Sequence, residues 1–79
     1  MKVDVSYFAI LREQRGLSAE TLSTEAATPA ELYAELRGQY RFSLDGRFVR
    51  AAVNDEFVPG DAALREGDRI TFIPPVAGG

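Results

Sequence analysis

The C-terminal residues are the part of this 79-residue sequence whose types and spacing best fit a chemical role. They read Pro74, Pro75, Val76, Ala77, Gly78 and Gly79. Because each proline lacks a backbone donor and holds φ at about −65°, a strand cannot continue through the pair, and the chain leaves in an extended form. The residues after Pro75 reach about 13–14 Å at full extension. The glycines have no side chains, so the tip of this arm fits a channel that a Cβ atom would obstruct.

The reactive group of such an arm is the terminal carboxylate of Gly79, which is a poor electrophile and a poor nucleophile until it is activated. We expect an ATP-dependent partner to form an acyl-adenylate there, after which an incoming sulfur yields a thiocarboxylate that delivers sulfur. The sequence contains no cysteine and no histidine. The sulfur must therefore come from outside, and we expect this chain to bind no metal and no cofactor of its own.

Paired carboxylates are a second possible source of chemistry, either as acid and base or as ligands of a divalent cation. The acidic residues of the second half are Asp55, Glu56, Asp61, Glu66 and Asp68. They cluster around glycine, proline and asparagine, where acidic side chains stabilise turns and stay solvated, so we interpret them as turn residues. Gly60 and Gly67 belong to no glycine-rich phosphate loop, and we therefore expect no nucleotide site on this chain.

Length and composition limit the class of protein. With 46% hydrophobic and 27% charged residues the chain fits one domain, because a chain this short buries only about 60–65% of its unfolded surface. The net charge of −3 argues against a nucleic-acid partner. The first residues alternate in polarity, unlike a secretory signal, and no apolar run reaches membrane-spanning length. We expect a cytoplasmic protein that does not associate with membranes.

The elements that must position the arm begin with an alternating stretch from Lys2 to Ile10, which predicts a half-buried strand. Residues 11–16 predict a turn or two of helix, and residues 20–23 predict part of a second strand, antiparallel to the first. The capping box at residues 28–31 has proline at the first helical position and predicts the main helix. Its apolar residues recur at helical spacing, and we expect the helix to end near Gly38.

The second half of the chain predicts three more strands. An Asp-Gly turn precedes a strand at residues 48–53, and a tight turn leads into the short Phe57-Val58. Residues 61–64 suggest one helical turn, and residues 66–68 suggest a reversal before the last strand at residues 69–73. One long helix among these strands predicts an α+β β-grasp fold, a mixed sheet with the helix packed across one face and the first and last strands adjacent. We expect residues 1–75 to form this domain and residues 76–79 a flexible tail.

The sheet face away from the helix is predicted to carry an apolar patch. Phe8 and Ile73 fall on that face near the end where the tail departs, and Phe57 extends the patch. Single exposed apolar residues are normal on protein surfaces. Because two of these lie together on predicted neighbouring strands, we interpret the patch as a docking surface for a partner protein, with Arg12 in its polar rim.

Three motifs of the sequence resemble a known family. They are Tyr7-Phe8-Ala9 with Arg12-Glu13, then Ala51-Ala52-Val53-Asn54, and the C-terminal series Leu64, Gly67-Asp68, Ile70, Phe72, Pro74-Pro75-Val76 and Gly78-Gly79. Together they resemble the small, sulfur-carrying subunits of molybdopterin synthases, over nearly the whole length. The C-terminal series is quite specific, because the proline pair and the diglycine stand at fixed distances from the Gly-Asp turn.

The resemblance implies a ubiquitin-like β-grasp protein whose terminal Gly79 is adenylated by a ubiquitin-activating-like adenylyltransferase that uses Mg and ATP. The glycine is then converted to a thiocarboxylate. The tail of such a carrier inserts into the large synthase subunit and donates sulfur to cyclic pyranopterin monophosphate, two sulfurs making the molybdopterin dithiolene. The complex is a heterotetramer. Phe8, Arg12, Phe57 and Ile73 lie at positions that match the family's interface.

Three alternatives remain open at this stage. A sulfur carrier for thiamin biosynthesis or tRNA thiolation shares the diglycine but less often has Phe72 followed by Pro74-Pro75-Val76. A ubiquitin-like protein modifier is joined to lysines and produces adducts of high mass. A plain interaction module with an inert tail keeps its binding when Gly79 is deleted.

Overall fold

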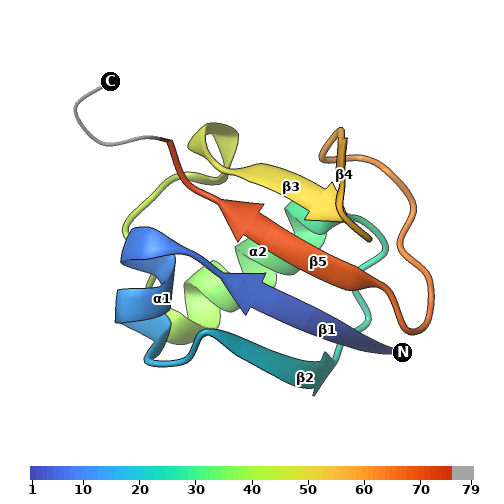
Figure 1. The fold of residues 1–79 in the computed structure, drawn as a ribbon, viewed down its shortest axis with the longest axis horizontal. Helices are drawn as coiled ribbons and strands as arrows, with labels where there is room; N and C mark the ends of the chain where they lie inside the picture. Colours follow the sequence, from blue (N-terminus) through green and yellow to red (C-terminus); the bar gives the residue numbers. More distant parts are fainter. Residues whose placement is uncertain (76–79) are drawn as a thin grey trace.

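A five-stranded mixed sheet and one long helix make up most of the molecule (Figure 1). The computed structural model describes residues 1–75, and the predicted flexible tail at 76–79 lies outside the described residues. The strands are β1 (Lys2–Tyr7), β2 (Ala19–Ser23), β3 (Arg50–Val53), β4 (Glu56–Val58) and β5 (Arg69–Ile73). The helices are α1 (Ala9–Arg15), α2 (Pro29–Tyr40) and the short 3₁₀ helix η1 (Gly46–Phe48).

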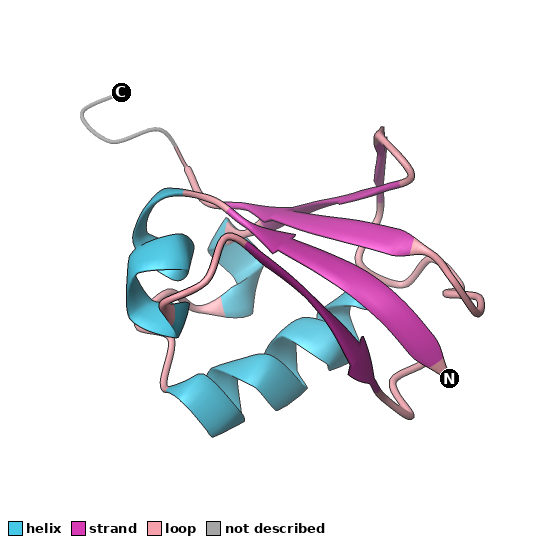
Figure 2. Cartoon of the chain, turned by 60° about the horizontal axis from the view of Figure 1, so that its bottom comes forward, coloured by secondary structure: helices cyan, strands magenta, loops and turns pink. Residues whose placement is uncertain are grey.

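The sheet order is β2-β1-β5-β3-β4, with β1 and β5 parallel and the other pairs antiparallel. The first and last strands are therefore neighbours in the middle, as predicted. Figure 2 shows α2 lying along one face of this sheet, while no helix of residues 1–75 covers the other face. This arrangement is the ubiquitin-like β-grasp fold, and we call the uncovered side the outer face.

The core lies between the sheet and α2. Alternating residues of β1 and β5 are buried there, and so is one stripe of α2, as the sequence periods predict. The central members are Val3, Val5, Tyr7, Leu32, Tyr33, Leu36, Ile70 and Phe72. Phe42, which follows α2, packs its ring on Tyr33 with centroids 5.8 Å apart, and Tyr33 meets Phe72 edge to face at 5.3 Å. These aromatic contacts join the helix to the central strand.

The predicted capping box is present at the start of α2. The backbone N–H of Glu31 donates to Thr28 Oγ1 at 3.2 Å, and the Glu31 carboxylate accepts from the backbone N–H of Ala27 at 2.9 Å. The predicted end at Gly38 is wrong, because α2 continues to Tyr40 and closes at Arg41, which has a φ of 59°. Tyr40 packs against the core, and this contact extends the helix past the glycine.

Two strand boundaries also differ from prediction. The first strand ends at Tyr7, not at Ile10, because Ala9 has a φ of 51° and the Phe8 carbonyl accepts from the N–H groups of Leu11 and Arg12, which begins α1. The third strand begins at Arg50, because residues 46–48 form η1.

Residues 61–64 form no helical turn. The backbone N–H of Leu64 instead donates to the Ala27 carbonyl at 2.9 Å, and this long-range bond holds the segment against the start of α2. In the described residues 1–75, no helix has the length and apolar character that crossing a membrane requires.

Candidate functional site

The predicted tail leaves the domain from the central strand. β5 ends at Ile73, after which Pro74 is buried and Pro75 is exposed. Because β5 runs parallel to β1, the start of α1 lies at the same end of the sheet (Figure 1). A hollow of about 590 Å³ lies there, lined by Phe8, Ala9, Ile10, Arg12, Glu13, Pro74 and Pro75. We call it the root hollow. The reactive group predicted at Gly79, with Val76, Ala77 and Gly78, lies outside the described residues.

The outer face carries a second hollow beside the first. Strand register places Ser6, Thr71, Ala52 and Phe57 in one row across β1, β5, β3 and β4. The hollow has a volume of about 400 Å³ and is lined by this row together with Phe8, Ile73, Asp55 and Arg69. Small side chains in the middle of the row and larger ones around it make a shallow recess, which we call the outer hollow.

The structure brings three of the four predicted docking residues to the outer hollow. Phe8 is 48% exposed and Phe57 is 57% exposed, while Ile73 is partly buried. Arg12 does not line this hollow. It lies in α1 and lines the root hollow, which shares Phe8 with the outer hollow. The two hollows therefore meet at Phe8, and the apolar surface continues from the sheet to the point where the tail departs.

The sequence analysis did not single out two arginines at this face: Arg69 lines the outer hollow, and Arg50 contacts Phe57. The guanidinium of Arg50 lies 4.1 Å from the centre of the Phe57 ring, and Arg69 forms an ion pair with Asp55. A guanidinium over an aromatic face is attracted by the ring quadrupole and covers part of its apolar surface. Strand alternation, which places Ala51 in the core, was a signal that could have placed Arg50 on the outer face. The contact of Arg50 with Phe57 could not have been found this way, because it depends on the β3–β4 register.

A polar network holds α1 against the sheet and was also missed. Arg15 donates from Nε and Nη2 to the two carboxylate oxygens of Glu20 at 2.7 and 2.8 Å, and the Tyr7 hydroxyl donates to Glu20 Oε2 at 2.7 Å. The Arg15 guanidinium also lies 4.0 Å from the centre of the Tyr40 ring. Because α1 carries Arg12 and follows Phe8, this network orients the rim of the root hollow.

The network also shifts the pKa values of its members. The hydrogen bonds from Arg15 have the largest effect on the Glu20 carboxyl, and they hold its pKa below the ordinary value. The hydrogen bond from Tyr7 lowers this pKa further. Burial, followed by the neighbouring Glu20, raises the pKa of the Tyr7 hydroxyl far above its ordinary value. Both groups therefore keep one protonation state around neutral pH, which suits a structural role.

Two of the five acidic residues of the second half hold the loop before β5, whereas Glu56 lies in β4 and is not a turn residue. The Asp68 carboxylate accepts from the backbone N–H of Arg65 and from the Asn54 amide, and Glu66 accepts from the backbone N–H of Lys2 at 2.9 Å. These bonds tie the loop before β5 to its neighbours, in agreement with the predicted turn role. Among residues 1–75, no group of three or more acidic side chains is placed to hold a metal ion.

Comparisons with known proteins agree along the whole chain. The ThiS family model matches residues 5–79. The molybdopterin synthase sulfur carrier subunit of Haemophilus influenzae is 32% identical over 80 residues, which cover 98% of this chain and 99% of that protein. The protein of the same name from Homo sapiens is 36% identical over 83 residues, covering 99% and 94%.

A solved structure shows a related chain with a partner. It is the protein–protein complex of subunits 1 and 2 of the molybdopterin-converting factor from Helicobacter pylori. One of its chains superimposes with a TM-score of 0.62 and 27% sequence identity, covering 100% of both chains.

Proposed function

This chain belongs to the ThiS family, and we propose that it is the sulfur carrier subunit of a molybdopterin synthase. The observation that carries the proposal is the match to sulfur carrier subunits over nearly the full length of both chains. The body of the domain supports it, because it offers no cysteine or histidine and places its open apolar surface where the tail departs.

In the proposed cycle the Gly79 carboxylate first attacks the α-phosphorus of ATP held with Mg by a ubiquitin-activating-like adenylyltransferase. This step forms the acyl-adenylate and releases pyrophosphate. A hydrosulfide equivalent from an external donor then displaces AMP, which leaves a thiocarboxylate on Gly79 and releases a proton. The glycine pair gives this end of the chain no side chains, so the reacting carbonyl fits a narrow active site.

The thiocarboxylate then transfers its sulfur in the large synthase subunit. Its sulfur forms a C–S bond by displacing an oxygen group from a carbon of cyclic pyranopterin monophosphate. Water then hydrolyses the resulting thioester, which returns the Gly79 carboxylate and leaves a thiolate on the precursor. Two loaded carriers supply the two sulfurs of the molybdopterin dithiolene. The cycle therefore needs a carrier that docks, reacts, leaves and is reloaded, and we expect it to dock in the heterotetramer that the resemblance implies, with the large subunits as a central dimer.

The outer face is the proposed docking surface for the large subunit. Phe8, Ile73 and Phe57 supply exposed apolar area, and partner interfaces bury such residues at their centres. Arg12 supplies a charge at the rim, next to Pro75. From Pro75 the remaining residues reach about 13–14 Å, enough to carry the terminal carboxylate into the partner. We place this cycle in the cytoplasm, where ATP is available.

The test is the intact mass of the full chain after incubation with the adenylyltransferase, Mg-ATP and a sulfur donor. We expect one oxygen to be replaced by one sulfur, and the loaded chain to form dithiolene when mixed with the large subunit and precursor. Deletion of Gly79 should abolish loading while leaving binding to the large subunit within about twofold, because the outer face is unchanged. An unchanged mass with a competent adenylyltransferase would contradict the proposal.

The same assay separates the alternatives. A carrier for thiamin biosynthesis or tRNA thiolation would load with sulfur but form no dithiolene with the large subunit. A ubiquitin-like modifier would form high-mass adducts on lysines of other proteins, and an inert-tail module would do neither.

A further inference from the structure

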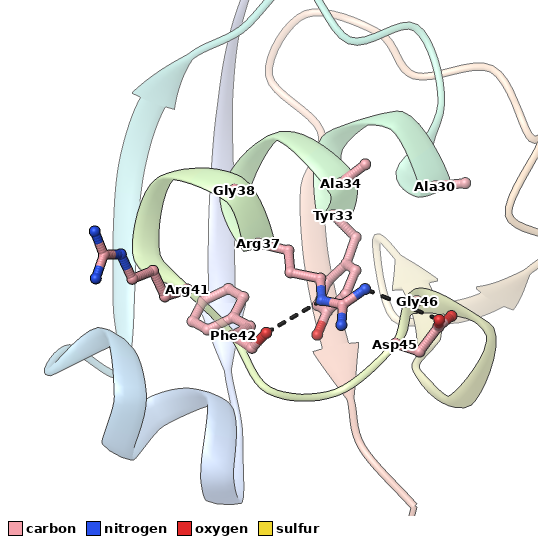
Figure 3. A pocket seen from close by; sticks show the side chains of 9 residues that line it. All are labelled: Ala30, Tyr33, Ala34, Arg37, Gly38, Arg41, Phe42, Asp45 and Gly46. Atoms are coloured by element: carbon pink, nitrogen blue, oxygen red, sulfur yellow. Dashed lines mark hydrogen bonds and ion pairs between the residues drawn. The ribbon is translucent and has the colours of Figure 1, made fainter.

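A groove lies on the helix side of the sheet, where residues 41–49 fold back along α2 (Figure 3). Its outer part has a volume of about 700 Å³ and its inner part about 270 Å³. Ala34, Arg37, Gly38, Arg41, Phe42 and Asp45 line the outer part. Pro29, Val49, Arg50, Ala51, Val58, Gly60 and Phe72 line the inner part. Ala30, Tyr33 and Gly46 line both, so the two parts join into one groove, which we call the α2 groove.

Gly46 lines both parts of the α2 groove and carries no side chain to fill it. A Cβ atom added to Gly46 would approach Tyr33 Cδ2 at 3.3 Å. Two hydrogen bonds from α2 side chains hold the loop after α2 in place along the groove. The Tyr33 hydroxyl donates to the Leu44 carbonyl at 2.8 Å, and Arg37 Nε donates to the Phe42 carbonyl at 3.1 Å. The groove is therefore formed before any ligand arrives, which lowers the ordering cost of binding.

The charge of this region differs from that of the rest of the chain. Residues 37–50 contain four arginines and one aspartate, which gives +4 − 1 = +3, so the remaining residues carry −3 − 3 = −6. Asp45 does not cancel the arginines, because it lies 3.9 Å from Arg37 Nη1 and 3.8 Å from Arg47 Nε and is shared between them. Arg41 is exposed, and within residues 1–75 it takes part in no ion pair.

We propose that the α2 groove binds an acidic segment of a partner protein, with one apolar side chain of that segment in the inner part. The inner part offers apolar contacts from Val49 and Val58, which are only partly buried. Arg37 and Arg41 lie along the outer part, where carboxylates of the segment gain charge-assisted hydrogen bonds. A nucleic acid is a poorer occupant, because the −6 carried by the rest of the chain repels a polyphosphate.

This site is separate from the proposed docking surface. The α2 groove lies on the side of the sheet that α2 covers (Figure 2), and its outer part shares no lining residue with the outer hollow. Arg50 is the link between the two sides, because it lines the inner part and also lies over the Phe57 ring. A partner in the groove therefore leaves the outer face free, and the carrier can hold two proteins at once. The inference depends on the groove alone and does not need the sulfur chemistry.

The test is an NMR titration of the ¹⁵N-labelled full chain with three synthetic peptides of glutamates around a central leucine, isoleucine or phenylalanine. We expect at least one peptide to shift the amide signals of Tyr33, Gly38, Arg41 and Gly46, and its affinity to fall several-fold when salt is added. A peptide with lysines in place of the glutamates should bind at least tenfold more weakly.

Matched variants locate the binding. Ala34→Glu puts a charge and bulk on the exposed wall, and Arg41→Glu reverses a charge, so each should weaken binding at least tenfold. Gln39→Glu on the same helix and Arg65→Glu in the loop before β5 make the same charge changes outside the groove and should bind normally. Unchanged amide spectra away from the groove will show that the variants are folded.

Three outcomes would overturn the proposal. The first is an absence of shifts with all three peptides at millimolar concentration. The second is equal binding of the lysine peptide, or shifts that map to the outer face. The third is a concentration-dependent shift of the groove residues without peptide, which would make a second copy of the chain the occupant.

Discussion

Tyr7 of β1 lies opposite Phe72 of β5 in the parallel pair at the centre of the sheet, and both side chains are buried against α2. Because side chains alternate along a strand, the next residues, Phe8 and Ile73, turn to the opposite side and line the outer hollow together. One register therefore sets both the core beneath the sheet and the apolar surface above it, at the point where the tail begins.

Truncation of the outer surface should weaken docking without unfolding the domain. We expect Phe8→Ala and Ile73→Ala each to cost about 1–2 kcal/mol of affinity for the large subunit, since exposed apolar anchors dominate interfaces of this kind. Isothermal titration calorimetry measures the affinity, and thermal unfolding checks the fold. Phe48→Ala is the matched control, because Phe48 is also about half exposed but lies in η1, away from the outer hollow. Equal losses at Phe8 and Phe48 would contradict the assignment of the surface.

The Glu20 network should make stability depend on pH in the acid range. The folded state holds the pKa of Glu20 below its ordinary value, mainly through Arg15, so the unfolded state binds more protons as the pH falls. Glu20 therefore makes its full contribution to the free energy of unfolding at a pH above the ordinary pKa that it has in the unfolded state. This contribution is lost as the pH falls through the lower pKa of the folded state. Glu20→Gln should flatten this part of the pH profile of the free energy of unfolding.

The same variant should lower stability at neutral pH by about 1 kcal/mol, because Arg15 and Tyr7 lose a charged partner in a partly buried site. Urea unfolding at a series of pH values measures both effects. Glu13→Gln removes the same charge from an exposed position of α1 and serves as the control. A Glu13→Gln profile that flattens as much as that of Glu20→Gln would show that net charge, and not the network, causes the pH dependence.

The same glycine-to-alanine change should have opposite effects at two positions. Gly38 lies inside α2 with no atom within 4 Å of an added Cβ, so Gly38→Ala should raise the free energy of unfolding by about 0.5–1 kcal/mol. Gly67 has a φ of 84° in the turn before β5, where alanine is strained. Gly67→Ala should therefore lower the free energy of unfolding by about 1 kcal/mol. Chemical denaturation of both variants checks the pair, and two changes of the same sign would contradict it.

Replacement of Arg41 by glycine should stabilise the domain. Arg41 closes α2 in the left-handed region, with a φ of 59°, where glycine is the residue that helix ends prefer. We expect Arg41→Gly to raise the free energy of unfolding by about 0.5–1 kcal/mol, measured by urea titration. Arg41→Ala is the control, because it removes the same side chain without relaxing the backbone. An equal gain from alanine would mean that charge, not conformation, limits stability here.

Local patterns in the sequence were enough for much of the fold. The alternation of β1 and β5, the capping box at Thr28 and the tight turn after Val53 are each set by residues a few positions apart, and the structure contains all three. The errors fell at element ends. Tyr40 keeps α2 helical past Gly38, and the bond from Leu64 to Ala27 prevents a helical turn, because contacts far away in the chain outweigh weak local propensities.

The sequence by itself determined the fold class and which strand residues share a face, because hydrophobic periods and turn signals depend only on neighbouring residues. The tail chemistry stays a prediction, since its reactive end lies outside the described residues. Only the tertiary structure decided which side chains meet. Tyr7 and Glu20 are 13 residues apart, and Arg50 reaches Phe57 through the register of β3 and β4. The α2 groove likewise depends on tertiary packing, which brings Gly46 against Tyr33. Such contacts depend on how whole elements pack, and no local spacing encodes them.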